Sequence, residues 1–348
     1  MKPSITSQAM GLTVLSAVLL GLASTNARAQ GSLTPPGVPA PTMKTLDQVE
    51  PRVPLSTGLL ITNAGSYYLT TNLTVSSGDV IRIDADNVTL DLNGFTIGST
   101  AYPASGAAIV IYGGRHDITI RNGFIRGGVT NNGNGVYTGP GFEDGIVTAT
   151  GPTPRNVRVS GVSISGCERD GINLSSDGGA LVENCVVRTV GRYGIWADTI
   201  LACTAKDSGL HAIAGVVVSD SRGESVGGYG VNAVVAHNCT GSSVSNIGLM
   251  VANSQNCYGS SSSGDGLNAT TAHNCYGSSS GSGTGLFAFY TAQNCYGESQ
   301  SGPRGLYAVN ASFCSASRPS GRAVEATLAN GCWAAAGTNV ITYKYNMP

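Results

Sequence analysis

Residues 257–275 read CYGSSSSGDGLNATTAHNC, and this stretch is one unit of the repeat that decides the fold. Its two cysteines belong to a column in which a cysteine recurs about every 18 residues, with Ser221 at the one place that lacks a cysteine. Such regular spacing is typical of a stacked repeat in which each unit contacts only its neighbours. The column comprises Cys185, Cys203, Ser221, Cys239, Cys257, Cys275, Cys295, Cys314 and Cys332.

A short strand is predicted between successive column positions. Residues 266–269 (GLNA) are typical, because apolar and variable residues alternate after a glycine. Leu267 is expected to point inward and Asn268 outward. The inward row is expected to include Leu249, Leu267, Leu286 and Leu306. The outward row is expected to consist of Asn173, Trp196, His211, Asn232, Met250, Asn268, Phe287 and Tyr307.

A turn is predicted directly before each column position, because asparagine tolerates left-handed backbone geometry. The expected turn residues are Asn184, Asn238, Asn256, Asn274 and Asn294. In the amino-terminal half, Gly94, Gly123 and Val162 take the cysteine's place at wider spacing, so longer loops are expected there.

Residues 61–69 (ITNAGSYYL) and 87–94 (NVTLDLNG) resemble the entry segment of secreted bacterial right-handed parallel β-helix repeat proteins of the pectin-lyase-like fold. The resemblance covers residues 58–345 and implies an all-β, right-handed parallel β-helix, a solenoid. It implies no single activity, because that fold hosts lyases, hydrolases, epimerases and adhesins. A left-handed β-helix needs an aliphatic residue every sixth position, and His273 lies six residues after Leu267.

The amino terminus predicts export. Lys2, the apolar stretch 11–23 and the small residues of 27–29 indicate a signal peptide over residues 1–29. Residues 30–57 are rich in proline and are expected to form a linker, followed by a β-helix domain over 58–348. The alternative is a membrane anchor, but the apolar stretch is shorter than the roughly 20 residues of a span. We therefore expect an exported protein, periplasmic, at the cell surface or extracellular, with no membrane span after signal removal.

Composition agrees with a solenoid exposed to solvent. The chain has 49 glycines, 11% charged residues and a net charge of −1, with no block of Lys or Arg. This charge pattern gives no support for nucleic-acid binding. Three states of the cysteine column stay open: buried free thiols, disulfides between neighbouring coils, and metal binding.

No catalytic motif known from the fold occurs in the chain. Polysaccharide lyases with this fold pair carboxylates, often holding calcium, with an Arg or Lys base. Hydrolases similar to polygalacturonase show Asn-Thr-Asp, Asp-Asp, Gly-His-Gly and Arg-Ile-Lys, and alginate epimerases show Asp-Pro-His-Asp. None of these strings is present.

Charge, aromatic residues and a long insertion coincide in one region, which predicts a groove. Residues 127–156 are the longest interruption of the repeat, and the coils that follow carry most of the charge. If the protein is a lyase, Arg169 or Arg192 is the expected base or carboxylate-neutralising group, and acidic residues could hold calcium through oxygen ligands. The alternative is solvated charges on turns. The expected catalytic residues are Arg169, Arg192 and Asp170, and the expected ligand-binding residues are Asp144, Trp196, Asp198 and His211.

Two functions follow as hypotheses. The first is an exported β-helix protein that recognises extracellular or cell-envelope polysaccharide, with or without lyase- or hydrolase-like activity. The exposed rings of the outward row would then form a saccharide platform, although packing under another segment explains the same rings. The second is a non-catalytic structural or adhesive envelope protein in which the uniform Ser/Gly coils of residues 239–301 provide length.

Overall fold

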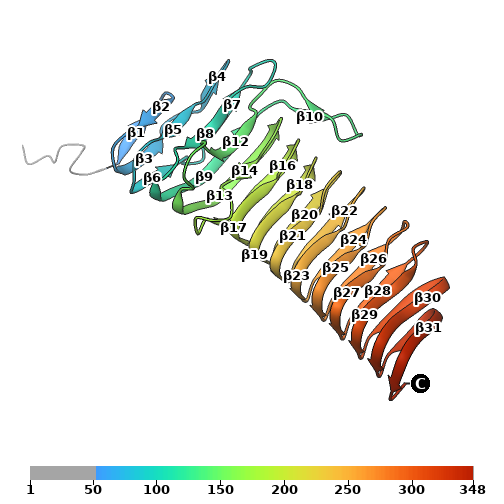
Figure 1. The fold of residues 1–348 in the computed structure, drawn as a ribbon. Helices are drawn as coiled ribbons and strands as arrows, with labels where there is room; N and C mark the ends of the chain where they lie inside the picture. Colours follow the sequence, from blue (N-terminus) through green and yellow to red (C-terminus); the bar gives the residue numbers. More distant parts are fainter. Residues whose placement is uncertain (1–51, 348) are drawn as a thin grey trace, which may run out of the picture. The chain divides into compact units, whose positions relative to one another are not determined.

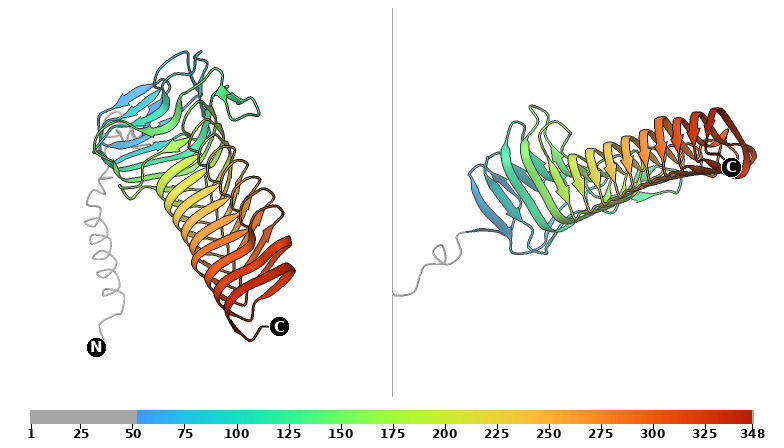
Figure 2. Two further views of the ribbon diagram at one scale, coloured as in Figure 1. Left: turned by 45° about the vertical axis from the view of Figure 1, so that its right-hand side comes forward. Right: turned by 90° about the horizontal axis from the view of Figure 1, so that it is seen from below.

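The computed structural model of the chain describes residues 52–347, which form a right-handed parallel β-helix (Figures 1 and 2). Of the strands in this part of the chain, 29 belong to one continuous sheet, and the remaining two form an antiparallel hairpin. The expected fold class is confirmed. Within residues 52–347, no helix has the length and apolar character that crossing a membrane requires.

The strands follow one another in regular order along the chain. The amino-terminal strands are β1 (Val53–Leu55), β2 (Leu59–Ile61), β3 (Gly65–Leu69), β4 (Leu73–Val75), β5 (Ile81–Ile83), β6 (Val88–Asp91), β7 (Thr96–Ser99), β8 (Ala107–Ile111), β9 (His116–Arg126), β10 (Thr130–Asn131), β11 (Tyr137–Thr138), β12 (Asp144–Thr148) and β13 (Arg155–Cys167). The later strands are β14 (Ile172–Asn173), β15 (Leu181–Glu183), β16 (Val186–Val190), β17 (Ile195–Leu201), β18 (Thr204–Ser208), β19 (Ile213–Ser219), β20 (Arg222–Ser225), β21 (Val231–His237), β22 (Thr240–Ser243), β23 (Leu249–Gln255), β24 (Tyr258–Ser261), β25 (Leu267–His273), β26 (Tyr276–Ser279), β27 (Leu286–Gln293), β28 (Tyr296–Ser299), β29 (Arg304–Ser312), β30 (Ser315–Asn330) and β31 (Trp333–Tyr345).

The β-structure begins earlier than expected. Strand β1 pairs in parallel with β3, so the β-helix includes Val53 rather than starting at residue 58. The signal peptide predicted for residues 1–29 and most of the predicted linker lie outside the described residues.

Each regular coil contains one short strand and one long strand. In the coil around residues 257–275, the short strand β24 leads through a corner loop to the long strand β25, and a tight turn at Asn274 leads to the next short strand, β26. Equivalent strands of successive coils pair in parallel: Leu267 lies opposite Leu249 in one neighbour and Leu286 in the other. The coils therefore keep one register along the solenoid (Figure 1).

The predicted inward rows are confirmed. Leu249, Leu267, Leu286 and Leu306 are all fully buried. Each column cysteine is buried too, and those of residues 239, 257 and 275 lie at the starts of successive paired short strands. All nine cysteines are buried free thiols. The core is thus a thin column of aliphatic side chains edged by a row of sulfur atoms.

The predicted turns are confirmed by backbone geometry. Asn238, Asn256 and Asn274 have φ values of 53°, 55° and 53°, in the left-handed region that asparagine tolerates. The side chain that follows the turn asparagine contacts the carbonyl of the residue that precedes this asparagine. Cys239 Sγ, after Asn238, lies 3.2 Å from the carbonyl oxygen of His237. At the one place without a cysteine, the Ser221 hydroxyl donates to the equivalent carbonyl of Ser219 over 2.7 Å. Serine therefore fits the same turn.

One early position departs from the prediction. Thr96 pairs with Phe124, so Phe95, rather than Gly94, lies opposite Gly123 in the cysteine column. The turn there has one more residue, because Asn93 and Gly94 both adopt positive φ.

Candidate functional site

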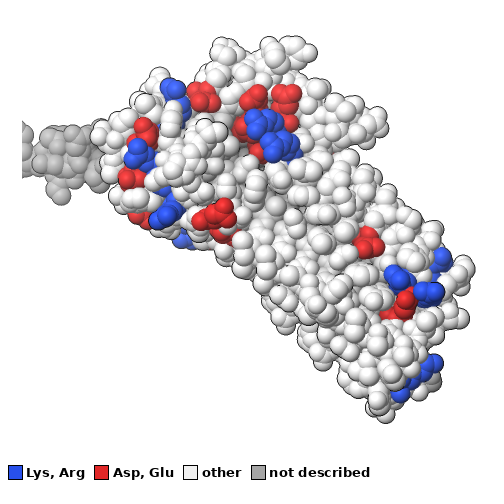
Figure 3. All heavy atoms as spheres, viewed as in Figure 1, with Lys and Arg blue, Asp and Glu red and all other residues white. Residues whose placement is uncertain are grey.

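A groove of about 340 Å³ lies where the corner loops meet the first long strands, and it gathers four of the predicted site residues. Arg169, Asp170, Arg192 and Trp196 line it together with the end of β12 and the loop that follows, residues 147–151 and 153. We call this the arginine groove. Figure 3 shows basic side chains beside acidic side chains over the amino-terminal half of one face of the protein.

The register of the coils brings these residues together. Ile146 pairs with Ile172, and Ile172 pairs with Ile195. Asp144, Asp170 and Tyr193 each lie two positions before one of these isoleucines, so they occupy equivalent places on neighbouring coils. Arg169 directly precedes Asp170, and Arg192 directly precedes Tyr193. Arg169 and Arg192 are thus neighbours, and the backbone N–H of Arg192 donates to the backbone carbonyl of Arg169 over 2.8 Å.

Behind the arginines, Asp170 forms part of the floor of the groove, and the buried Asp144 lies next to it without lining the groove. Asp144 Oδ1 accepts the backbone N–H of Asp170 over 3.0 Å. Asp170, only 1% exposed, accepts the backbone N–H of Tyr193 over 3.1 Å and the side-chain amide of Asn173 over 2.8 Å. Burial is the main reason that the pKa of Asp144 rises from its ordinary value of 3.8 to about 6. The backbone hydrogen bond from Asp170 opposes the rise, and the Asp170 carboxylate adds to it. Cys167 is also buried, and burial together with these two carboxylates raises the pKa of its thiol.

The arginine side chains reach from this floor to solvent. Arg169 Nη1 lies 3.8 Å from Asp144 Oδ2, and Arg192 Nε lies 3.8 Å from Asp170 Oδ1. The two arginine side chains are 46% and 41% exposed. Each guanidinium has more N–H donors than these contacts use, so the arginines can hold a ligand carboxylate at the same time.

A column of aromatic rings begins beside the groove and follows the next coils, and its members Tyr193, His211 and Tyr229 do not line the groove. Tyr193 lies between Arg192, whose guanidinium is 5.5 Å from its ring centre, and Trp196, whose ring centre is 4.8 Å away. His211 and Tyr229 follow on the next two coils, stacked with ring centres 4.6 Å apart and planes within 4°. Burial lowers the pKa of His211, which favours the neutral ring, and its Nδ1 accepts the backbone N–H of Tyr229 over 3.0 Å.

The placement of His211 in the outward row was wrong. Trp196 pairs with Ala214, which in turn pairs with Asn232, so Ala214 holds that place in the row. Residues 209–212 (GLHA) imitate the strand pattern but lie largely in the corner loop before β19. His211 belongs instead to the aromatic column that begins at Tyr193.

Asp198 does not line the arginine groove. Its Oδ2 accepts the backbone N–H of Ala180 over 2.7 Å, so it holds the loop that leads into β15. We assign it a structural role, because its carboxylate is used by a neighbouring coil.

The long insertion contributes only its carboxyl-terminal end to the groove. Its hairpin, β10 and β11, reaches along the short strands, where Tyr137 donates to Asp207 over 2.8 Å and Asn131 donates to the same carboxylate over 2.6 Å. Burial and the Asp207 hydrogen bond raise the pKa of Tyr137. The hairpin is therefore fixed to the solenoid, and the groove wall comes from residues 147–153.

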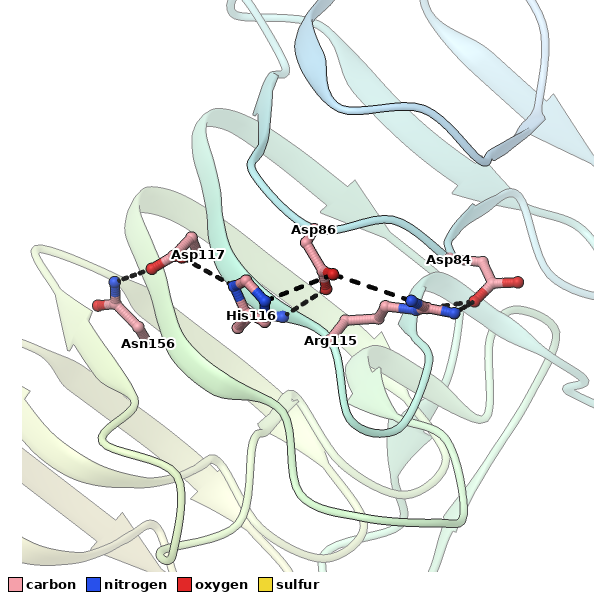
Figure 4. A network of polar contacts seen from close by, with 6 residues as sticks. All are labelled: Asp84, Asp86, Arg115, His116, Asp117 and Asn156. Carbon is pink, nitrogen blue, oxygen red and sulfur yellow. Dashed lines mark hydrogen bonds and ion pairs between the residues drawn. The ribbon is translucent and has the colours of Figure 1, made fainter.

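A second polar network, which sequence analysis did not identify, joins neighbouring amino-terminal coils (Figure 4). Arg115 Nη2 lies 2.8 Å from Asp84 Oδ1, and His116 Nδ1 lies 2.8 Å from Asp117 Oδ2. Hydrogen bonds from Asn156 and His116 hold the pKa of Asp117 below its usual range. The side chains are partly exposed, so they contribute little stability. The network comprises Asp84, Asp86, Arg115, His116, Asp117 and Asn156.

Among residues 52–347, no group of three or more His, Cys, Asp or Glu side chains is arranged to hold a metal ion. Calcium binding through oxygen ligands therefore stays a prediction, which a titration with added calcium tests.

Replacing Asp144 by Asn is expected to change how stability depends on pH. Because folding raises the pKa of this carboxyl group from 3.8 to about 6, its protonated form favours the folded chain. That stabilisation is complete below the unfolded pKa and is lost as the pH rises through about 6, a difference of about 3 kcal/mol by neutral pH. Asn keeps an oxygen acceptor for the Asp170 N–H and does not ionise. In urea unfolding, the free energy of unfolding of the variant relative to that of wild type should increase by about 3 kcal/mol between about pH 4 and about pH 7. A difference that is constant with pH would contradict the raised pKa.

No protein-family model matches the chain, and no curated protein matches it significantly. Among solved structures, the chain is similar to the A-module of mannuronan C-5 epimerase from Azotobacter vinelandii, with 12% identity over 82% of this chain and 88% of that one, and a TM-score of 0.49. It is also similar to the Dettilon tailspike protein, with 9% identity over 83% of this chain and 61% of that one, and a TM-score of 0.36. At these identities the likeness concerns the fold alone and assigns no substrate to this chain. The bacterial and secreted origin implied by the resemblance stays a prediction.

Proposed function

We propose that the arginine groove binds an acidic polysaccharide, one that carries carboxylate groups on its sugar rings. The observation that carries the proposal is the pair of half-exposed guanidinium groups on neighbouring coils, Arg169 and Arg192. Arginine is well suited to this task, because its planar group donates two parallel hydrogen bonds to one carboxylate.

The buried carboxylates support this assignment by orienting the arginines. Asp144 and Asp170 each accept a backbone hydrogen bond and lie 3.8 Å from one guanidinium. Contacts at that distance hold the arginines near the groove without using all of their donors. On the solvent side, a ligand carboxylate would pair with Arg192 and would compete at Arg169 with the exposed Glu143, whose Oε2 lies 3.8 Å from Arg169 Nη1.

Trp196 supports binding of a sugar ring. It lines the groove next to the arginines and is partly exposed. Aromatic rings pack against the C–H surface of sugars, while polar groups such as the Asn173 amide bind hydroxyl groups. Together these side chains offer charge, an apolar wall and hydrogen bonds within one groove.

If the protein is also a lyase, the arginines would act on the sugar carboxylate. A guanidinium next to Asp144 or Asp170 is cationic, so neutralising a uronate carboxylate suits Arg169 or Arg192 better than removing a proton. Such an activity would place Asp170 as the residue that positions Arg192. We also propose that the protein is exported, at the periplasm, cell surface or outside the cell, on the basis of Lys2 and residues 11–29.

The test is calorimetric titration with oligomers of galacturonate and of mannuronate, with and without calcium, together with an assay for unsaturated sugar products. The variant Arg169→Ala/Arg192→Ala/Trp196→Ala should lose at least about 100-fold in affinity, since two charge-assisted pairs and a ring contact are removed.

A matched control removes two arginines and one aromatic residue elsewhere. Arg188, Arg222 and Phe289 are exposed and lie away from the groove, so replacing all three by alanine should leave the affinity unchanged. Unchanged affinity in a folded groove variant would contradict the proposed site. If wild type binds no acidic oligomer, the structural or adhesive function becomes the better explanation.

A further inference from the structure

A second groove, of about 610 Å³, runs along the other corner of the coils, at the asparagine turns. Three tyrosines, Tyr258, Tyr276 and Tyr296, form one side, and the turn asparagines form the other. Phe313, whose side chain is exposed, lies at the carboxyl-terminal end. We call this the tyrosine groove. It shares no lining residue with the arginine groove.

The tyrosines form a continuous stack across three coils. Each follows a column cysteine, and the parallel register places Tyr258 opposite Tyr276 and Tyr276 opposite Tyr296. The ring centres are 5.0 and 5.2 Å apart, with planes within 6° and 12°. Tyr276 is held by a 2.7 Å hydrogen bond from its hydroxyl to Glu298. Because stacked rings cover one another's faces, the groove meets mainly the edges of the tyrosine rings, and the end ring Tyr258 is 40% exposed.

The asparagines form a parallel row of amides. The Asn256 side-chain N–H₂ donates to Asn238 over 3.2 Å, and that of Asn274 donates to Asn256 over 3.3 Å. A carboxamide has two N–H donors and two acceptor lone pairs, and the row uses one of each. These asparagines are exposed, so one donor and one lone pair per coil remain for a ligand.

The chemistry of this groove differs from that of the arginine groove. No Lys, Arg, Asp, Glu or His is among the described residues that line it. One ring and one amide recur on three successive coils, with the spacing of about 4.8 Å between paired strands. A matching ligand is uncharged, has both C–H surfaces and hydroxyl groups, and repeats along its length.

We propose that the tyrosine groove binds a linear, uncharged polysaccharide that lies along the axis of the solenoid. One sugar ring would pack on the open face of Tyr258 at the end of the stack, and the following sugars would lie along the edges of Tyr276 and Tyr296. The hydroxyl groups would bind the free donors and acceptors of the amide row. The groove would add a neutral-glycan site to a protein whose arginine groove takes an acidic one. Neither site requires the other.

The test uses cellohexaose, laminarihexaose and maltohexaose, three uncharged oligomers with different linkages, in calorimetric titrations of the protein. At least one should bind, and Tyr258→Ala/Tyr296→Ala should weaken that binding at least tenfold. The same variant should bind acidic oligomers as wild type does, which separates this proposal from the proposed function. If the double variant does not fold, Tyr258→Ala alone, at the exposed end of the stack, replaces it.

The matched control is a second aromatic stack in the same part of the solenoid. Phe287 and Tyr307 stack with ring centres 4.8 Å apart on the long strands β27 and β29. Replacing both by alanine removes comparable packing and should leave neutral-oligomer affinity unchanged. Absence of binding to all three oligomers overturns the proposal. Equal loss of affinity in the two double variants also overturns it, because the tyrosines would then act only through stability.

Discussion

Replacing Leu267 by Ala is expected to lower the free energy of unfolding by about 2–5 kcal/mol. Leu267 is fully buried and lies in register between Leu249 and Leu286, so the truncation leaves a cavity in the middle of the aliphatic row. The neighbouring coils cannot close this cavity without breaking their own pairing. Urea unfolding of the variant and of wild type measures the difference.

His273→Gln in the same strand is the control. Its side chain is partly exposed, and the paired residues Gln255 and Gln293 are already glutamine. Its stability should therefore equal that of wild type within about 0.5 kcal/mol. Equal losses in the two variants would show that the inward and outward faces are assigned wrongly.

A methyl group at Gly266 is expected to cost about 3 kcal/mol or more, above the usual range for overpacking. A Cβ atom there would lie 2.2 Å from the backbone nitrogen and 2.4 Å from the carbonyl oxygen of Ser278, and 2.6 Å from the oxygen of Gly285. Backbone atoms cannot move aside as a flexible side chain can. Gly266→Ala should therefore lower the melting temperature strongly and broaden the transition, as local pairing between coils is lost.

Gly98→Ala tests whether the lack of space for a Cβ atom explains the loss of stability in Gly266→Ala. Gly98 lies in strand β7, whereas Gly266 directly precedes β25. A Cβ atom at Gly98 would meet its nearest neighbours at 3.7 Å, an ordinary contact distance. Neither glycine needs a positive φ. The expected pattern is a near-neutral Gly98→Ala and a destabilised Gly266→Ala. Equal effects would contradict the close approach of the Ser278 and Gly285 backbone to Gly266.

The coils could be predicted from sequence because the same positions are buried in every coil. The column around Cys257, the leucine row at Leu267 and the turns at Asn256 each depend on one residue type in one place per coil. Stacking then determines their neighbours without any knowledge of distant contacts. The same reasoning could have placed His211 correctly: Ile195 and Leu267 each lie ten residues after the cysteine before them, and Ile213 lies ten after Cys203.

Buried serines could not be predicted in this way. Ser261 and Ser279 are buried at the ends of short strands, where polar residues are normally expected outside. The Ser279 hydroxyl donates to the carbonyl of Gly264 over 2.8 Å, and the Ser261 oxygen accepts the N–H of that same glycine over 2.8 Å. Their role depends on backbone groups of the corner loop, whose path the amino-acid pattern does not show.

The candidate site was predicted in part. Arg169, Arg192 and Trp196 meet because adjacent coils bring them together, and this follows from their spacing once the coils are recognised. Asp198 lies outside the groove because its carboxylate binds the backbone of Ala180, which precedes β15 on the neighbouring coil, and the residue pattern alone does not show this contact. The path of the hairpin of residues 130–138 likewise depends on Asp207, which is far away in sequence.

Hydrogen–deuterium exchange of the protein with and without a bound acidic oligomer tests the central claim most directly. Binding in the arginine groove should slow exchange in residues 147–153, 169–173 and 192–196, and should leave the tyrosine groove, including residues 256–258, unchanged. Slower exchange confined to other coils, or no change at a saturating concentration of galacturonate and mannuronate oligomers, would contradict the assignment of the arginine groove as an acidic-polysaccharide site.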